Sequence, residues 1–229
     1  MLVHLPGVLT AEETAALRER LEAADAPWVD GRVTAGHQGA AVKHNEQLAE
    51  DSALARELGD AVLARLERHP RFISAALPDR VYPPMFNRYR GGGEFGSHVD
   101  NAVRFIPGTG RKLRTDVSAT LFLAEPDRYD GGELLVEDTY GVQTLKLAAG
   151  DMVLYPSTSL HRVTPVTRGT RLACFLWVQS MVRDDAQRSL LFDMDNALQR
   201  LAATGADETA RAHLLGGYHN LIRMWAAVG

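Results

Sequence analysis

The feature that most constrains the fold is a change of hydrophobic period near residue 80. From there to about residue 183 the chain consists of short runs rich in Val, Leu, Thr and aromatic residues, without segments of helical period between them. Gly-containing turn signals separate the runs. Strands at this spacing predict an antiparallel sandwich or barrel such as a jelly roll. The predicted runs are 81–89, 113–124, 133–137, 142–147, 151–155, 160–166 and 171–182.

The chain before this region is predicted to be mainly helical. A capping box that starts at Thr10 predicts a helix over residues 11–24. Leucines and valines at helical spacing predict a second helix, which begins after Asp51 or Ser52 and stops at His69-Pro70.

Two further segments complete the organisation. The Asp30-Gly31 pair predicts a hairpin over residues 28–33. From about residue 184 the composition is helical again, with one apolar face formed by Leu190, Leu191, Met194, Leu198 and Leu201. We therefore expect an α+β protein in three parts that form one unit. These are an N-terminal helical and extended segment packed on the core (1–79), the β-core (80–183) and a C-terminal helical segment (184–229).

Composition excludes several classes of protein. The 229 residues carry a net charge of -4, so no overall positive field favours nucleic acid or an anionic membrane. The single cysteine, Cys174, excludes an intrachain disulfide framework and a thiolate-rich metal site. The first residues lack the basic and apolar regions of a signal peptide, and no run is long enough for a membrane span. We expect a cytoplasmic protein without nucleic-acid or membrane partners.

The most informative stretch for chemistry is residues 86–100, which ends in His98-Val99-Asp100. Two metal-binding side chains two residues apart lie on the same face of an extended segment. The pattern alone is weak, because His44-Asn45-Glu46 matches it as well. A structural His–Asp pair in a sheet is the alternative interpretation of His98 and Asp100.

Two later residues give this motif its context. His161 is a polar residue in a predicted strand, and Arg171 follows ten residues later at the start of an apolar run. An arginine there should either lie at the barrel rim or have an anionic partner, because burying it unpaired is costly. Two histidines and one carboxylate on strands are the ligand set of non-haem Fe(II) oxygenases.

This order of residues resembles the Fe(II)- and 2-oxoglutarate-dependent dioxygenases with a double-stranded β-helix core. Four stretches are similar in sequence to the bacterial PKHD-type hydroxylases, relatives of the prolyl-4-hydroxylases often associated with iron uptake. These stretches are 86–100, 129–134, 161–166 and 177–184. The resemblance implies that the iron ligands are His98, Asp100 and His161. It also implies that Arg171 anchors 2-oxoglutarate. Tyr89 falls where related enzymes often contact the co-substrate, although core packing explains it equally well.

The activity implied is hydroxylation of a peptidyl or small-molecule substrate, coupled to conversion of 2-oxoglutarate and O2 into succinate and CO2 and linked to iron homeostasis. Fe(II) is the implied metal and L-ascorbate the implied reductant. Two alternatives are a cupin-like metal sensor without turnover and a metal-dependent hydrolase on a similar barrel. A sensor needs neither Arg171 nor a co-substrate, and a hydrolase would prefer Zn(II).

Two segments remain open at this level. Residues 101–112 form either a solvated loop or a lid over the substrate. The C-terminal helices either cover the barrel or form a homodimer interface. Their many apolar residues include Leu214, Leu215, Leu221, Ile222, Met224 and Trp225.

Overall fold

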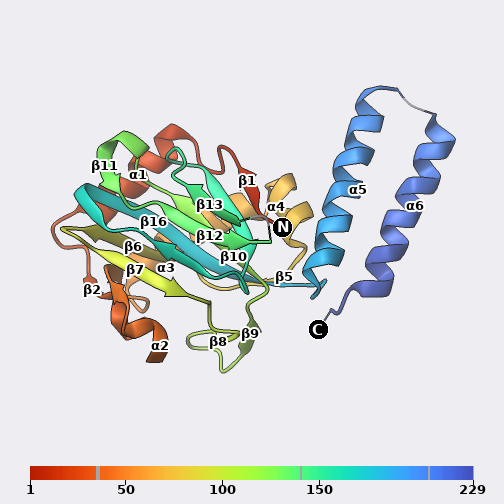
Figure 1. The fold of residues 1–229 in the computed structure, drawn as a ribbon. Coiled ribbons are helices and arrows are strands. Elements are labelled where there is room, and N and C mark those ends of the chain that lie inside the picture. Colours follow the sequence, from red (N-terminus) through yellow and green to blue (C-terminus); the bar gives the residue numbers. More distant parts are fainter. Residues whose placement is uncertain (35–36, 140, 206, 229) are drawn as a thin grey trace.

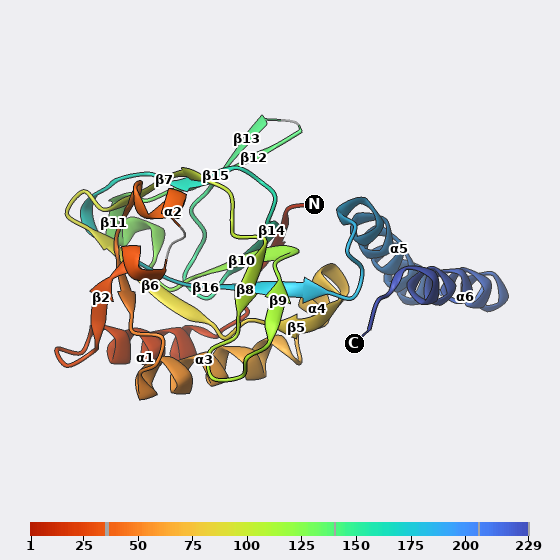
Figure 2. The same ribbon diagram turned by 90° about the horizontal axis from the view of Figure 1, so that it is seen from below.

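The structure, a computed structural model, describes residues 1–34, 37–139, 141–205 and 207–228. Two antiparallel sheets face each other, and a pair of long helices extends from one side of this body (Figure 1). The larger sheet lies between the smaller sheet and the N-terminal helices (Figure 2). The antiparallel double-sheet core predicted from the sequence is confirmed.

The larger sheet contains the central strands of the molecule. Its order is β1 (Val3–Leu5), β14 (Met152–Pro156), β10 (Val117–Phe122), β16 (Val166–Ser180), β6 (Met85–Arg90), β4 (Glu46–Leu48) and β2 (Trp28–Asp30). Two more strands, β5 (Pro78–Val81) and β11 (Tyr129–Gly131), also pair with β16. Every residue of β10 is buried, as expected for a strand covered on both faces.

The smaller sheet holds the metal-binding motif. Its order is β13 (Gly141–Leu145), β12 (Leu134–Asp138), β15 (His161–Val163), β7 (Glu94–His98) and β3 (Lys43–His44). A separate two-stranded hairpin is formed by β8 (Val103–Phe105) and β9 (Lys112–Arg114). The segment 101–112, left open by the sequence, therefore contains part of a hairpin next to the motif.

Helices of the N-terminal third cover the outer face of the larger sheet (Figure 2). They are α1 (Ala11–Glu22), α3 (Ala53–Leu66) and α4 (Pro70–Ala76), while the short α2 (His37–Ala40) and the 3-10 turn Gly31–Thr34 lie near the smaller sheet. The predicted capping box at Thr10 is confirmed, since its side chain accepts from the Glu13 N–H. Ser52 caps α3 in the same way. Leu17, Leu21, Leu58, Val62 and Leu66 bury one face of these helices in the core.

The predicted hairpin over residues 28–33 is wrong. Strand β2 pairs with β4, and the chain then enters the 3-10 turn Gly31–Thr34. The Asp30 carboxylate accepts from the backbone N–H of Arg32, and this local contact replaces a two-residue hairpin turn. The strand is completed by a partner more distant in sequence than the hairpin prediction assumed.

Two predicted strands are each divided in the structure. Pro83 and Pro84 cannot donate ladder hydrogen bonds, and they separate β5 from β6 within the run 81–89. The run 113–124 is divided at Asp116, whose carboxylate accepts from the Ser180 N–H. The predicted run 171–182 falls on the long strand β16, which begins earlier, at Val166, and ends at Ser180.

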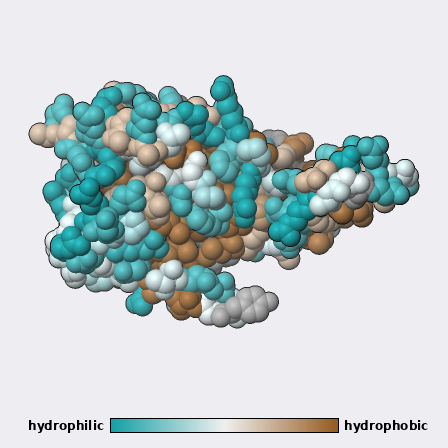
Figure 3. All heavy atoms as spheres, turned by 90° about the horizontal axis from the view of Figure 1, so that it is seen from above, coloured by the Kyte–Doolittle hydropathy of each residue, from teal (hydrophilic) through white to brown (hydrophobic). Residues whose placement is uncertain are grey.

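The C-terminal segment forms an antiparallel pair of helices, α5 (Asp185–Ala203) and α6 (Glu208–Trp225), that projects from the sheets (Figures 1 and 3). Its own apolar cluster comprises Leu77, Val182, Leu191, Leu198 and Tyr218. Leu190, predicted on this same face, is exposed. Within the described ranges, none of the helices has the uninterrupted apolar length that a membrane crossing requires.

Candidate metal centre

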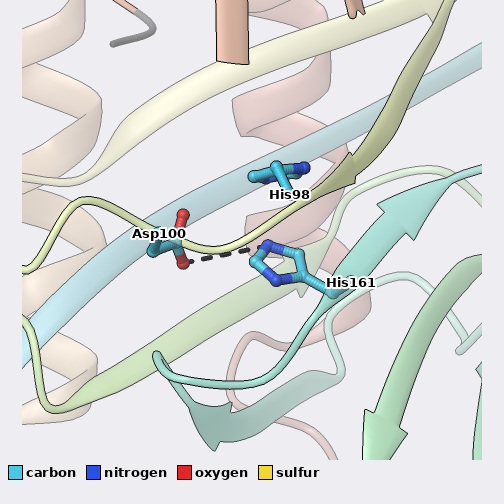
Figure 4. A group of neighbouring side chains, drawn as sticks. All are labelled: His98, Asp100 and His161. Atoms are coloured by element: carbon cyan, nitrogen blue, oxygen red, sulfur yellow. Dashed lines mark ion pairs between the residues drawn. The ribbon is translucent and has the colours of Figure 1, made fainter. Parts of the chain in front are cut away.

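Three potential metal ligands converge near the end of β7, where this strand pairs with β15. His98 and His161 are register partners across the two strands, and their ring centroids lie 4.2 Å apart. Asp100 follows β7 by two residues and turns toward the same point (Figure 4). Ligand atoms of the three side chains lie within 4.8 Å of one another. The sheet register thus joins residues that are far apart in sequence.

The two histidines are oriented by the same local contact. Nδ1 of His98 lies 2.8 Å from the carbonyl oxygen of Gly96, and Nδ1 of His161 lies 3.0 Å from that of Ser159. A carbonyl can only accept, so each Nδ1 donates, and in the neutral ring this tautomer leaves the lone pair on Nε2. Burial, reinforced by the neighbouring His161, lowers the pKa of His98 to about 4. His98 is therefore a neutral imidazole, the form that binds metals.

The third ligand is held by hydroxyl groups. Ser118 on β10 donates to the Asp100 carboxylate at 2.5 Å, and its oxygen lies 2.8 Å from that of Ser157. Asp100 Oδ2 lies 3.8 Å from Nε2 of His161 (Figure 4). These contacts fix one carboxylate oxygen close to the ligand atoms of both histidines.

Arg171 is the most deeply buried charged residue near this centre, with 1% of its surface exposed. It lies inside β16 and not at its start, between the rings of Tyr89 and Phe122 at 5.3 and 5.2 Å. Within the described residues its Nε has no hydrogen-bond partner. The rim position considered from the sequence is therefore wrong. A buried guanidinium with an unused donor is costly unless an anion binds to it.

Two tyrosines accompany Arg171. Tyr89 is its register partner on β6, and burial raises the pKa of the phenol, which therefore stays protonated. The Tyr129 hydroxyl is buried without a hydrogen-bond partner in the described part of the chain. A Cβ atom at Gly132 would lie 2.9 Å from the Tyr129 ring and 3.0 Å from Cδ of Arg171. The sequence alone assigns no role to Tyr129, although this residue begins the stretch 129–134 that carries part of the family resemblance.

One pocket contains both groups of residues. Its lining includes the three potential metal ligands, Arg171 and Tyr89. The other His-x-acid match does not take part: His44 is exposed, and Glu46 pairs with Arg88 at 2.8 Å.

The donor set fits Fe(II). Two neutral imidazoles and one carboxylate are the facial ligands of non-haem iron oxygenases, and they leave coordination positions open. The unpartnered Nε of Arg171 fits the distal carboxylate of 2-oxoglutarate, since a guanidinium binds a carboxylate through two parallel hydrogen bonds. The fold and the site therefore define the class of 2-oxoglutarate-dependent Fe(II) oxygenases.

Comparisons with known proteins agree with this class. Residues 84–179 match the family model of the 2OG-Fe(II) oxygenase superfamily, and residues 185–227 match that of the PKHD-type hydroxylase C-terminal domain. A PKHD-type hydroxylase of Burkholderia ambifaria is 67% identical over 99% of both chains. One from Pseudomonas putida is 60% identical over the full length of both. The chain belongs to the PKHD-type hydroxylase family.

Comparison with solved structures supports the fold independently of the sequence matches. The crystal structure of a Pseudomonas putida prolyl-4-hydroxylase superposes with a TM-score of 0.57, at 23% identity over 78% of this chain and 92% of that one. The predicted double-stranded β-helix is confirmed. The protein is a 2-oxoglutarate-dependent dioxygenase that uses Fe(II) and O2. Its family favours this activity over the sensor and hydrolase alternatives.

Proposed function

We propose that His98, Asp100 and His161 bind Fe(II), and that Arg171, with Tyr89 beside it, binds the distal carboxylate of 2-oxoglutarate. The observation that carries this proposal is the buried Nε of Arg171, which has no partner among the described residues and lies in the pocket of the three ligands. We add the Tyr129 hydroxyl as a second donor to the same carboxylate.

The chain's own residues bind and orient the reactants. The carbonyls of Gly96 and Ser159 fix the tautomer of both histidines, and Ser118 fixes the Asp100 carboxylate. The rings of Tyr89 and Phe122 exclude water from the Arg171 guanidinium, which strengthens its attraction to an anion. When bound, Fe(II) and 2-oxoglutarate supply the oxidising chemistry, in which O2 delivers one oxygen atom to succinate and one to a substrate C–H bond. L-ascorbate serves as the reductant.

The test is coupled turnover. We expect purified protein to convert 2-oxoglutarate to succinate in the presence of Fe(II), O2 and cell extract, and His98→Ala to abolish this conversion. Succinate formation at an unchanged rate in His98→Ala would reject the metal assignment. Incubation of the same extract under 18O2 would identify the substrate, peptidyl or small-molecule, by the mass of incorporated oxygen. An acceptor that takes part in iron acquisition is expected from the implied link to iron homeostasis.

We further propose a homodimer formed through α5 and α6. The support is the exposure of apolar residues on this projecting pair, which include Leu190, Leu214, Leu215 and Met224. Sedimentation should show a dimer for the wild type, and Leu214→Lys combined with Leu215→Lys should shift it toward the monomer. A monomeric wild type at micromolar concentration would reject the proposal.

The three parts of the chain are proposed to have separate roles. Residues 1–79 support the larger sheet, residues 80–183 perform the chemistry, and residues 184–229 mediate assembly. The match of separate family models to 84–179 and 185–227 supports this division. We propose the cytoplasm as the place of action, since the single buried cysteine and the oxygen-sensitive Fe(II) suit a reducing compartment.

A further inference from the structure

A second cationic region lines the pocket, away from Arg171 along the strands. Phe175 and Trp177 follow Arg171 on the same face of β16, about 13 and 20 Å along the strand. The Lys43 ammonium lies 5.9 Å from the centroid of the Phe175 ring, and the Arg104 guanidinium lies 4.5 Å from that of Trp177. All four residues line the pocket that contains the metal ligands.

Lys43 is an unusual pocket residue because it is a lysine with only 4% of its surface exposed. Its ammonium donates to the neutral Gln47 side chain at 3.1 Å and lies 5.4 Å from the Phe95 ring, which stacks on His98. Burial and the nearby Arg104 charge lower the pKa of Lys43 to about 8. A charged amine held in such surroundings is stabilised when an anion joins it.

Two acidic groups near these cations, Glu50 and Asp100, contribute to the net charge of the pocket wall. Glu50 lies 3.9 Å from the Arg104 guanidinium and also accepts from the Tyr82 hydroxyl. Asp100 belongs to the metal centre. With Fe(II) and the dianionic co-substrate bound, the charges of the metal, Asp100, the co-substrate and Arg171 cancel. Glu50 offsets one of the two remaining positive charges, those of Lys43 and Arg104, so one net positive charge remains beside the two aromatic rings.

A polar group completes this wall. Asn87 on β6 is 8% exposed, and its Oδ1 is buried without a hydrogen-bond partner in the described ranges. It lines the pocket and is the register partner of Ala173, between Arg171 and Phe175 on the neighbouring strand. A buried acceptor without a donor costs free energy, so a ligand N–H or O–H group is its expected partner.

We propose that this part of the pocket binds the prime substrate, and that the substrate is a carboxylate attached to an aromatic or other apolar group. The part meant is lined by Lys43, Asn87, Arg104, Phe175 and Trp177. Lys43 and Arg104 bind the carboxylate, Phe175 and Trp177 contact the apolar group, and Asn87 accepts from an N–H or O–H group. This inference rests on the proposed function, because Arg171 must be occupied by 2-oxoglutarate for the second region to be available to the substrate.

The test uses protein loaded with Mn(II) and saturating 2-oxoglutarate, with benzoate as the probe and benzamide as its neutral counterpart. Relaxation of the probe's ring protons by Mn(II) reports binding near the metal. We expect benzoate to bind about 10-fold or more tightly than benzamide, the effect of one charge-assisted contact. Lys43→Met and Arg104→Met should each remove most of this preference. Lys112→Met, which removes an equal charge at an exposed position of β9, should leave this preference unchanged.

Equal or undetectable binding of benzoate and benzamide, with 2-oxoglutarate bound normally, would overturn the substrate class and leave the proposed function intact. The same holds if both pocket variants keep the preference. Loss of 2-oxoglutarate binding in the wild type would instead overturn the proposed function together with this inference. Displacement of benzoate by the peptide acetyl-Ala-Glu-Ala-amide would assign the carboxylate to a peptidyl substrate, and its failure to displace benzoate would assign it to a small molecule.

Discussion

Two buried arginines, in two regions of the molecule, differ in how many of their donors have partners within the protein. Arg188, in the first turns of α5, is 2% exposed, and Arg171, inside β16, is 1% exposed. Arg188 donates to the carbonyls of Val182 and Arg183 at 2.8 and 2.7 Å and to the Asp185 carboxylate at 3.1 Å. Arg171 lies between aromatic rings, and its Nε has no partner within the described residues.

The difference follows from the cost of burying a charge. Hydrogen bonds to protein groups offset this cost for Arg188, and they connect the segment after β16 to α5. We propose that an anion entering the pocket offsets this cost for Arg171, because its Nε has no hydrogen-bond partner within the described residues. We therefore expect variants at Arg171 to change ligand binding and variants at Arg188 to change stability.

The largest effect is expected at the metal ligands. His98→Ala or Asp100→Ala should abolish coupled succinate formation, because each variant removes a ligand from an open three-residue set. The fold should remain largely intact, since an open-site metal adds less folding energy than a closed structural one. Succinate assays and thermal unfolding measure the two effects. Global unfolding of both variants would favour the structural His–Asp pair.

The next effect is expected at Arg171. Arg171→Ala removes a charge-assisted contact of about 1.5–3 kcal/mol, so the affinity for 2-oxoglutarate should fall roughly 10- to 150-fold. Arg171→Lys should recover part of this loss through its charge but not the two-pronged geometry. Metal binding should change little, because Arg171 is not a ligand. Separate titrations with metal and with co-substrate measure this. Joint loss of both ligands would show a structural role.

Arg188 should behave in the opposite way. Arg188→Met leaves the Val182 and Arg183 carbonyls without their donor and should lower the free energy of unfolding by about 1–3 kcal/mol. The affinity for 2-oxoglutarate should equal that of the wild type. Chemical denaturation and the same titration test both halves of this expectation. A variant of Arg188 that lost co-substrate binding at full stability would break the comparison.

A smaller effect is expected at the turn next to Arg171. A Cβ atom at Gly131 would lie 1.9 Å from the carbonyl oxygen of Pro165, and its φ of +73° already disfavours a side chain. Gly131→Val should lower the melting temperature more than it changes the affinity for 2-oxoglutarate. Gly91→Val is the control, because its φ is also positive but nothing lies within 4 Å, so its loss should be smaller. Unchanged stability with lost co-substrate binding would place this turn in the site.

The smallest effect concerns pH. The pKa of Lys43 is about 8 in the folded protein, against 10.5 for an unperturbed lysine. The unfolded chain therefore binds more protons between these values, and this residue's contribution to stability should rise as the pH increases through that window. Relative to the exposed control Lys112→Met, Lys43→Met should flatten the dependence of stability on pH between 8 and 10.5. Parallel curves for the two variants would show that Lys43 is not buried as a charged group.

The sequence predicted those features that depend on local chemistry. The capping box at Thr10 and the helix start at Ser52 need only neighbouring atoms, and both are confirmed. The spacing of His98, Asp100, His161 and Arg171 indicated the class of enzyme. The pairing of β2 with β4 and the depth of Arg171 could not be predicted, because both depend on strands that are distant in sequence. For the same reason Lys43, from β3, gave no sign that it reaches the pocket.

The most direct test of the central claim is an anaerobic titration of Fe(II)-loaded protein with 2-oxoglutarate, monitored through the weak visible charge-transfer band of an Fe(II)–keto-acid chelate. We expect the band to appear and saturate in the wild type and in Arg188→Met. In Arg171→Ala it should require roughly 10- to 150-fold more 2-oxoglutarate, for the loss of a charge-assisted contact. Absence of the band in the wild type at saturating 2-oxoglutarate, or an unchanged titration in Arg171→Ala, would contradict the account.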